Sequence, residues 1–329
     1  MEHCKAYRIF NENNTISGRV TTVPVADIGH GAVMFRTAYS SVNFKDALAA
    51  TGTGGKIIRN YPLIGGIDAA GSVISSSDAR FAAGDEIICT SYDMGVAHDG
   101  GFAEICRVPA DWVVPLPPGL TLFDAMALGT AGYTAGLAVE LLELNGMAPN
   151  NGKVLVNGAT GGVASLVIDM LAAKGYSVTA ITGKAAEHDF LRKLGAAEIL
   201  DRGSLEMGAR PLEKPLWAAA FDAVGGEQLA WLTRTMQPQG LIASFGNAGG
   251  IELNTTVLPF ILRGVRLIGV DSAATPMALR RRVWGRLASD LKPRHLGEIA
   301  QVIGLADLTD YIGRMLKGEI RGRAVVRML

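Results

Sequence analysis

Up to residue 120 the chain carries short apolar runs separated by Gly, Pro, Asn and Asp. Apolar and polar side chains alternate over residues 33–39 (VMFRTAY), and further β-prone runs follow at 71–75, 86–90 and 102–108. Alternation with a period of two, bounded by turn residues, is typical of half-buried strands. This part of the chain is therefore predicted to be β-rich and irregular.

The pattern changes after Leu120. Thr121 is a predicted N-cap of a helix, and residues 137–144 form a second helical stretch. From Lys153 onward, short apolar strands alternate with helices of about ten residues, which indicates a parallel sheet covered on both faces. We expect strands at 154–156, 177–181, 198–201, 218–222, 241–245 and 265–270, and helices at 163–173, 185–194 and 227–236. From Met277 the chain is expected to be helical until a last strand at 324–326.

These patterns divide the chain into three segments. A length of 329 residues corresponds to about two domains. We expect residues 1–121 to form the first part of a β-rich domain and residues 122–272 to form an α/β domain. Residues 273–329 are expected to return to the first domain.

Composition and charge exclude several classes of protein. The 31 basic side chains balance 31 acidic ones, whereas a general nucleic-acid binder needs a basic surplus. Cys4, Cys89 and Cys106 are scattered and odd in number, which fits a reduced compartment better than a disulfide framework. The N-terminus lacks a hydrophobic signal core, and no run of about 18 uninterrupted apolar residues occurs. We expect a cytoplasmic protein with neither nucleic-acid nor membrane partners.

A glycine-rich loop is the strongest local signal. The apolar run 154–156 leads into Gly158, Gly161 and Gly162, and a helical pattern follows. Glycines let a pyrophosphate approach the backbone, and the N–H groups at a helix start favour anionic oxygens. The spacing departs from G-x-G-x-x-G, but the surrounding β-α-β pattern favours a dinucleotide site over a plain turn.

The end of the next strand indicates which dinucleotide is bound. NAD sites usually place Asp or Glu there for the ribose 2′-hydroxyl. Here the strand ends in Thr182-Gly-Lys184, without a carboxylate. Lys184 can neutralise a 2′-phosphate, Thr182 can donate a hydrogen bond to it, and Arg202 can add charge. The sequence therefore favours NADPH over NADH, with a solvated Lys184 as the alternative.

The sequence gives little support for a metal site or for a catalytic nucleophile. The five histidines and three cysteines are dispersed, without the ligand spacing of a zinc site. No G-x-S-x-G elbow is present for a catalytic serine. We expect no metal, and chemistry supplied by the bound cofactor.

Several further segments, in order along the chain, resemble one superfamily. The segments are Ser41-Val-Asn-Phe-Lys-Asp-Ala-Leu, Gly65-Gly-Ile-Asp-Ala-Ala-Gly71, Ala83-Gly-Asp-Glu, Gly100-Gly-Phe-Ala-Glu, Gly129-Thr-Ala-Gly-Tyr-Thr-Ala and the glycine loop. With them the chain resembles the zinc-free, quinone-oxidoreductase-like branch of the medium-chain dehydrogenase/reductase superfamily. Residues 54–62, 210–217 and 259–272 narrow the resemblance to NADPH-dependent acrylyl-CoA reductases.

The resemblance implies a GroES-like catalytic domain, an inserted Rossmann domain with a doubly wound parallel sheet, and a homodimer. It also implies a set of cofactor contacts: Phe44, Thr130, Gly158, Thr160, Gly161, Gly162, Val163, Thr182, Gly183, Lys184, Arg202, Asn247, Ile261, Ser272 and Arg323. Phe44 departs from the tyrosine of the reductases, so a role for that hydroxyl is in doubt. Zinc-bearing relatives carry Gly-His-Glu where Gly66-Ile-Asp68 stands here.

The implied reaction is NADPH-dependent reduction of the C=C bond of an α,β-unsaturated acyl-CoA, with acrylyl-CoA as the expected substrate. Asn43 is a candidate orienting amide, Lys45 a candidate cation near the enolate, and Asp46 a loop organiser; Asn43 and Asp46 can also simply cap the turn. Lys56 and Arg59 are candidate contacts for the CoA phosphates. Residues 280–282 (RRR) are either part of that rim or a solvated helix face. Quinone or enone reduction, and a non-catalytic NADPH-binding module, remain alternatives.

Overall fold

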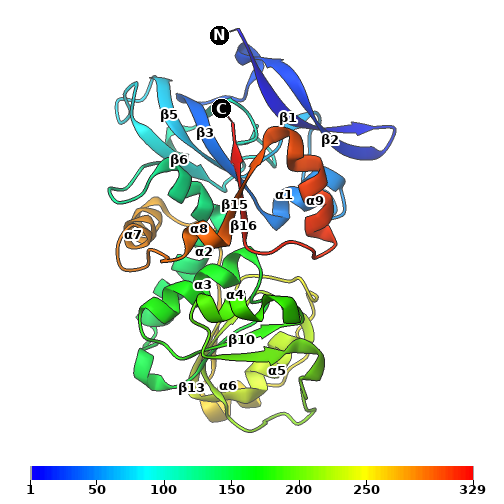
Figure 1. Cartoon of the computed structure of the whole chain (residues 1–329), viewed down its shortest axis with the longest axis vertical. Helices are drawn as coiled ribbons and strands as arrows, with labels where there is room; N and C mark the ends of the chain where they lie inside the picture. Colours follow the sequence, from blue (N-terminus) through cyan, green and yellow to red (C-terminus); the bar gives the residue numbers. More distant parts are fainter. Residues whose placement is uncertain (1, 329) are drawn as a thin grey trace. The chain divides into compact units, whose positions relative to one another are not determined.

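The computed structural model describes residues 2–328 and consists of two compact units (Figure 1). The β-rich unit comprises Met1–Ala131, Ala273–Ala288 and Leu296–Leu329. The α/β unit comprises Gly132–Ser272 and Ser289–His295. Each unit is described by itself below.

Two sheets build the β-rich unit. The larger has the order β15 (Ala300–Gly304), β16 (Arg323–Arg327), β3 (Val33–Val42), β5 (Asp68–Ser76), β6 (Glu86–Thr90), β8 (Val113–Pro115), with β7 (Ile105–Val108) also paired to β3. The smaller has the order β2 (Thr15–Pro24), β1 (His3–Glu12), β4 (Leu63–Ile64). Only the β15–β16 pair is parallel among these strands. The antiparallel β3–β5 pair later supplies most of the polar side chains of interest.

Four helices accompany these sheets: α1 (Phe44–Thr51), α7 (Met277–Leu287), α8 (Leu296–Ile299) and α9 (Leu308–Leu316). Helices α1 and α9 lie side by side although they are far apart in sequence (Figure 1). Ala47 of α1 and Leu308 and Ile312 of α9 share one buried apolar cluster with Val42 and Val326. This cluster fixes the start of α1 against the sheet, which positions the residues around Asn43.

The α/β unit holds a single parallel sheet. Its order is β11 (Glu198–Asp201), β10 (Val178–Thr182), β9 (Val154–Val156), β12 (Trp217–Asp222), β13 (Met236–Ser244), β14 (Arg266–Gly269). In Figure 1, α3 (Gly162–Ala173) and α4 (His188–Lys193) lie on one face, and α5 (Gly226–Thr235) and α6 (Leu258–Arg263) lie on the other. Numbered within the unit, the strand order is 3-2-1-4-5-6, the doubly wound dinucleotide-binding order, which confirms the predicted fold class.

One long helix, α2 (Leu122–Leu144), contains the boundary between the two units. It begins as predicted: the Thr121 hydroxyl accepts a hydrogen bond from the Asp124 N–H at 3.0 Å. The two helical stretches expected here form one element with non-helical dihedrals at Gly129. Its length and composition would suffice to cross a membrane, but 89% of an 18-residue apolar stretch of this helix is buried, as in the core helix of a folded domain.

Several expectations were wrong in detail. The hairpin β1–β2 was not predicted, because the polar, largely exposed sequence of β2 hides the alternation. The C-terminal part is not helical throughout: β15 interrupts it, a short strand whose sequence (AQVIG) carries little period-two signal. The helix expected at 185–194 is a 3-10 turn at Ala185–Glu187 followed by α4. The expected strands at 154–156, 198–201 and 324–326 are confirmed.

Candidate functional site

The glycine loop lies where the strand order of the parallel sheet reverses, between β9 and β12. Gly158 has a φ of +58°, and a Cβ there would lie 3.3 Å from the Ala223 side chain. A Cβ on Gly161 would lie 3.1 Å from the Gly158 carbonyl oxygen. These close contacts leave little room for a side chain, so glycine suits both positions in this loop, the glycine cradle, which lies beside the start of α3. Glycine backbone next to the N–H groups of a helix start is the arrangement that suits a pyrophosphate.

A buried polar pair braces the floor of this loop. The Asn157 side-chain amide donates to Asp222 Oδ1 at 2.6 Å and accepts the Ala223 N–H at 2.7 Å. Asp222 also accepts from the Gly225 N–H and from the Ser244 hydroxyl. The carboxyl ends of β9, β12 and β13 are thus joined. This brace was not predicted from the sequence, although Asn157 directly follows one apolar strand and Asp222 ends another.

The end of β10 brings together four of the predicted cofactor contacts. The Thr182 hydroxyl accepts the Lys184 N–H at 3.0 Å. A Cβ on Gly183 would lie 3.0 Å from Nη2 of Arg202, so the guanidinium lies directly against Gly183. Arg202 is exposed and Lys184 half-buried. Two cationic side chains therefore flank the strand end at which the ribose of a dinucleotide is usually bound.

The remaining predicted contacts of the α/β unit differ in their exposure. Thr160 is buried in the glycine loop, and Val163 is half-buried in the first turn of α3. Asn247 and Ile261 are exposed, and the Ser272 hydroxyl accepts from Thr134 at 2.8 Å. Their roles stay predictions.

In the β-rich unit, a buried carboxylate organises the other group of candidates. Asp68, the first residue of β5, has no exposed surface. Its Oδ2 accepts from the Ser41 hydroxyl and the Asn43 amide, each at 2.7 Å, and from the Thr130 N–H at 2.8 Å. Its Oδ1 accepts from the Thr130 hydroxyl at 2.5 Å. Asp68 was not predicted as a site residue, although it lies in the Gly66-Ile-Asp68 stretch that aligns with Gly-His-Glu of zinc-bearing relatives.

Arg323, the first residue of β16, neutralises this carboxylate. Its Nη2 donates to the Ser41 hydroxyl at 2.8 Å and lies 3.8 Å from Asp68 Oδ2. Its Nη1 donates to the last carbonyl of β3 at 2.9 Å and to Asn43 Oδ1 at 3.1 Å, and its Nε to a carbonyl of α2 at 3.3 Å. Burial lowers the pKa of Arg323, an effect that Asp68 opposes. Arg323 is 3% exposed and braces this network, and the cofactor contact that the resemblance implies stays a prediction.

Glycine at position 129 permits this network. Gly129 has a φ of +54°, and a Cβ there would collide with the Ser41 hydroxyl, Asp68 Oδ2 and Arg323 Nη2. A side chain at this position would therefore separate the ion pair or displace α2. The kink inside α2 lies at this same residue.

Asn43 and Asp46 form a capping box at the start of α1. Asp46 Oδ2 accepts from the backbone N–H of Asn43 at 2.8 Å and from its amide at 3.3 Å, while Oδ1 accepts the Ile67 N–H at 2.9 Å. The Asn43 amide thus donates to Asp46 and Asp68, and its predicted role as an orienting amide stays a prediction. Burial, with a smaller contribution from Asp68, raises the pKa of Asp46 to about 7.

Neighbouring candidates are more accessible. Phe44 is 47% exposed, and Lys45 is half-buried on the first turn of α1. Lys56 and Arg59 are exposed on the segment that follows α1. They therefore remain available to a ligand.

Arg280 corrects an expectation about the basic rim. It is fully buried, and its Nη1 donates to the Thr90 carbonyl and hydroxyl at 3.2 and 3.1 Å. Its Nη2 donates to the Ala273 carbonyl, and its guanidinium lies 4.5 Å from the Tyr92 ring centroid. Arg280 is neither a rim residue nor a solvated helix face, because it anchors the returning segment to the end of β6.

Two family models match the chain. "Alcohol dehydrogenase GroES-like domain" matches residues 29–118, and "Zinc-binding dehydrogenase" matches residues 162–288. These matches, together with the doubly wound sheet, define a two-domain dehydrogenase/reductase fold.

Two similar proteins narrow this class of dehydrogenase/reductase to one branch of a superfamily. "Putative quinone oxidoreductase YhfP" of Bacillus subtilis is 47% identical over 95% of both chains. "Acrylyl-CoA reductase AcuI" of Ruegeria pomeroyi is 44% identical over 96% of both. The chain belongs to the quinone-oxidoreductase-like branch of the medium-chain dehydrogenase/reductase superfamily.

Solved structures agree with this placement. The yhdH oxidoreductase of Salmonella enterica, in complex with NADP, has a TM-score of 0.96 at 44% identity, covering 99% of this chain and 100% of that one. Bacillus subtilis yhfP with NAD bound has a TM-score of 0.97 at 45% identity, covering 99% and 100%.

The name of the second family model raises the question of zinc. Among residues 2–328, no group of three or more His, Cys, Asp or Glu side chains is placed to hold a metal ion. The cysteines Cys4, Cys89 and Cys106 are all buried and belong to no such group. The donor set therefore does not fit zinc.

The raised pKa of Asp46 predicts a pH-dependent stability. Folding raises this pKa from 3.8 to about 7, so the native state holds the proton more tightly than the unfolded chain. The stabilisation is complete below the unfolded pKa and is lost as the pH rises through the folded pKa. Relative to Asp46→Asn, the wild type should lose up to about 1.4 kcal/mol of unfolding free energy per pH unit in this window. Urea denaturation at several pH values measures this, and parallel curves for the two proteins would contradict it.

Proposed function

We propose that the chain reduces the C=C bond of an α,β-unsaturated acyl-CoA with NADPH, and that acrylyl-CoA is the substrate. The similarity to acrylyl-CoA reductase AcuI over 96% of both chains carries the substrate class. The glycine cradle and the cationic pair Lys184 and Arg202 support the cofactor. The proposed partners are this small molecule and a second copy of the chain.

The cofactor would be held by the glycine loop of the α/β unit. The N–H groups at the start of α3 and the backbone of Gly158 and Gly161 receive the pyrophosphate. Lys184 and Arg202 neutralise the 2′-phosphate. When bound, reduced nicotinamide supplies the hydride that adds to the β-carbon of the thioester.

Residues of the β-rich unit act on the negative charge that develops on the thioester oxygen. Both N–H groups of the Asn43 amide are engaged by carboxylates, so Asn43 holds the start of α1 in place. Lys45, on the first turn of that helix, is the cation that stabilises the enolate. Phe44, with half its surface exposed, offers an aromatic face and no proton. The α-carbon proton then comes from water.

Exposed cations near α1 suit the CoA phosphates. Lys56 and Arg59 bind substrate and transition state alike, so their loss should raise KM with little change in kcat. Reduction of a quinone or enone is the second candidate, because "Putative quinone oxidoreductase YhfP" is 47% identical over 95% of both chains. A quinone has no phosphates, so it would not use these residues.

Substrate class is tested by anaerobic NADPH oxidation with acrylyl-CoA, crotonyl-CoA and a benzoquinone under the same conditions. We expect the largest kcat/KM with acrylyl-CoA, and a higher KM for it in a Lys56→Ala/Arg59→Ala double variant. An unchanged benzoquinone KM in that variant is the matched control. A larger kcat/KM for benzoquinone than for either thioester would overturn the proposal and favour quinone reduction as the activity.

Cofactor choice is tested at Lys184. Removing its charge should lower the ratio of kcat/KM for NADPH to that for NADH about tenfold, because a charge-assisted contact to the 2′-phosphate is lost. Lys214→Ala, at an exposed lysine of the same unit, should leave the ratio unchanged. An unchanged ratio in Lys184→Ala would show that Lys184 does not contact the 2′-phosphate.

A further inference from the structure

Asp222, the last residue of β12, is a buried carboxylate that collects hydrogen bonds from uncharged donors. It has no exposed surface. Its Oδ1 accepts from the Asn157 amide at 2.6 Å and from the N–H groups of Val224 and Gly225 at 3.2 and 3.1 Å. Its Oδ2 accepts from the Gly225 N–H and the Ser244 hydroxyl, each at 3.2 Å. These bonds are needed, because a buried carboxylate is costly unless its oxygens are hydrogen-bonded.

Only a carboxylate can serve all of these donors. An ionised carboxyl group has acceptor oxygens only, whereas an amide has one acceptor oxygen and one donor nitrogen. The donors belong to segments at the ends of three strands: Asn157 follows β9, residues 224–225 follow β12, and Ser244 ends β13. Asp222 therefore holds three strand ends of the parallel sheet in one arrangement.

Asn157 transmits this constraint to the glycine cradle. Since Asp222 only accepts, the side-chain nitrogen of Asn157 must face it, and the side-chain oxygen accepts the Ala223 N–H at 2.7 Å. Asn157 has no exposed surface and directly precedes Gly158, the first glycine of the cradle. The side chain of Asn157 is thus directed into the protein, and it acts on a ligand only through the backbone of the cradle.

The same carboxylate also fixes a pair of loops beside the cradle. Residues 223–226 follow β12, and residues 246–250 follow β13. The Gly249 N–H donates to the Val224 carbonyl at 2.7 Å, which joins the two loops. Asn247, a predicted cofactor contact, lies on the second loop. Loss of the carboxylate should therefore disturb the glycine cradle and this loop together.

We propose that Asp222 and Asn157 are positioning residues for a pyrophosphate: they hold the backbone of the glycine cradle in the conformation that binds it, and neither touches the ligand. This inference rests on the proposed function, because it requires a phosphorylated nicotinamide nucleotide at the cradle. The pair is bonded to the ends of β9, β12 and β13, whereas Lys184 and Arg202, the proposed 2′-phosphate contacts, follow β10 and β11. The pair should therefore affect binding of the pyrophosphate and leave binding of the 2′-phosphate unchanged.

Two nucleotides separate these contributions by binding alone, without turnover. NADP carries both the pyrophosphate and the 2′-phosphate, whereas adenosine 2′-monophosphate lacks the pyrophosphate. Asn157→Ala removes the side-chain hydrogen bonds to Asp222 and Ala223 and should weaken NADP binding about tenfold. The affinity for adenosine 2′-monophosphate should stay at its wild-type value. Calorimetry of the full-length protein measures the first affinity, and ligand-detected NMR measures the weaker second one.

An exchange of the two side chains tests the pairing itself. Asn157→Asp places two carboxylates opposite one another and should weaken NADP binding more than Asn157→Ala does. Adding Asp222→Asn restores an amide–carboxylate pair with exchanged roles and with the wild-type net charge. This double variant should bind NADP more tightly than Asn157→Asp alone, whereas the effects of two independent substitutions would add.

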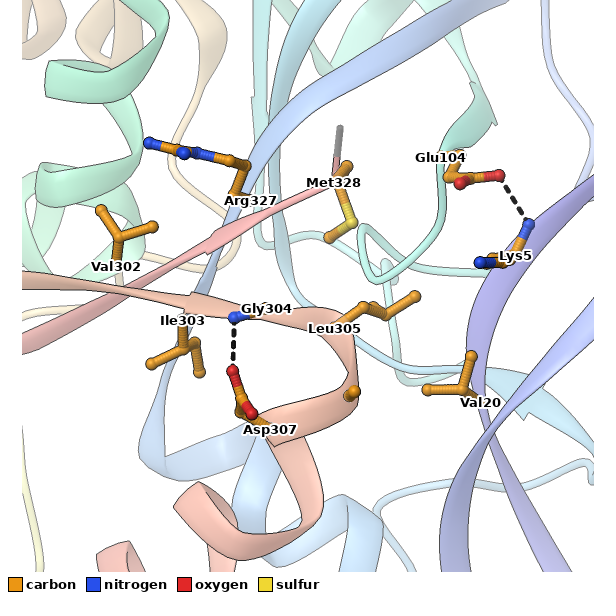
Figure 2. A pocket seen from close by; sticks show the side chains of 11 residues that line it. Lys5, Val20, Glu104, Val302, Ile303, Gly304, Leu305, Asp307, Arg327 and Met328 are labelled. Atoms are coloured by element: carbon orange, nitrogen blue, oxygen red, sulfur yellow. Dashed lines mark hydrogen bonds between the residues drawn. The ribbon is translucent and has the colours of Figure 1, made fainter.

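Two controls address general destabilisation and a second binding site. Asp169→Asn alters another buried carboxylate of the same unit, one hydrogen-bonded to His295, and should leave both affinities unchanged. Lys5 and Arg327 line a separate pocket of about 530 Å³ in the β-rich unit, where two cationic side chains also suit a phosphate (Figure 2). A Lys5→Ala/Arg327→Ala variant should bind both nucleotides as the wild type does.

The outcomes separate this inference from the proposed function. If the wild type binds no NADP, or if the Lys5→Ala/Arg327→Ala variant loses it, the proposed cofactor site fails and the inference with it. If the wild type binds both nucleotides but Asn157→Ala weakens both alike or neither, the inference is overturned while the proposed function stands. A double variant that binds NADP no better than Asn157→Asp also overturns it. If Asn157→Ala does not fold, Ser244→Ala decides, because it removes a single donor to Asp222 and should weaken NADP binding alone.

Discussion

The buried ion pair between Asp68 and Arg323 is the interaction on which the candidate site depends. It joins the start of β5 to the start of β16, elements from opposite ends of the chain. Removing one partner of a buried pair typically costs about 3–5 kcal/mol, because the other charge is left uncompensated. Ser41, Asn43 and Thr130 all take their orientation from this pair, so the site and the fold share one set of contacts.

The two units contribute different things. The α/β unit offers a glycine loop beside a helix start, and two cationic residues that follow neighbouring strands. The β-rich unit offers a closed network, in which Asn43, Asp46 and Arg323 direct their polar atoms to one another. Such a network fixes geometry more readily than it exchanges protons with a substrate. This division agrees with chemistry that is supplied by a cofactor and oriented by the protein.

The sequence predicted those features that depend on local pattern. The strand β9, the glycine loop and the start of α3 follow from apolar runs and glycine spacing within a few residues. The N-cap Thr121 is likewise a local signal. Lys184 and Arg202 were paired because each follows a strand of a parallel sheet, and the structure places Arg202 against the neighbouring Gly183.

Features that depend on long-range packing could not be predicted in this way. Asp68 stands in an apolar, glycine-rich stretch, and only tertiary contacts reveal that Arg323 and Thr130 meet it. Arg280 belongs to a run of three arginines, which is typical of a solvated helix face. Its side chain is nevertheless buried, and it donates to the carbonyl at the end of β6. The short strand β15 forms because β16 pairs with it.

Hydrogen–deuterium exchange in an Arg323→Met variant tests the central role of the ion pair most directly. The amides of Asn43, Ile67 and Thr130 donate to Asp46 or Asp68, so they should lose protection together when the guanidinium is removed. Amides of the parallel sheet, such as those of β9 and β12, should exchange as in the wild type. Full protection of all three amides in the variant would show that the network stands without Arg323 and would contradict the account.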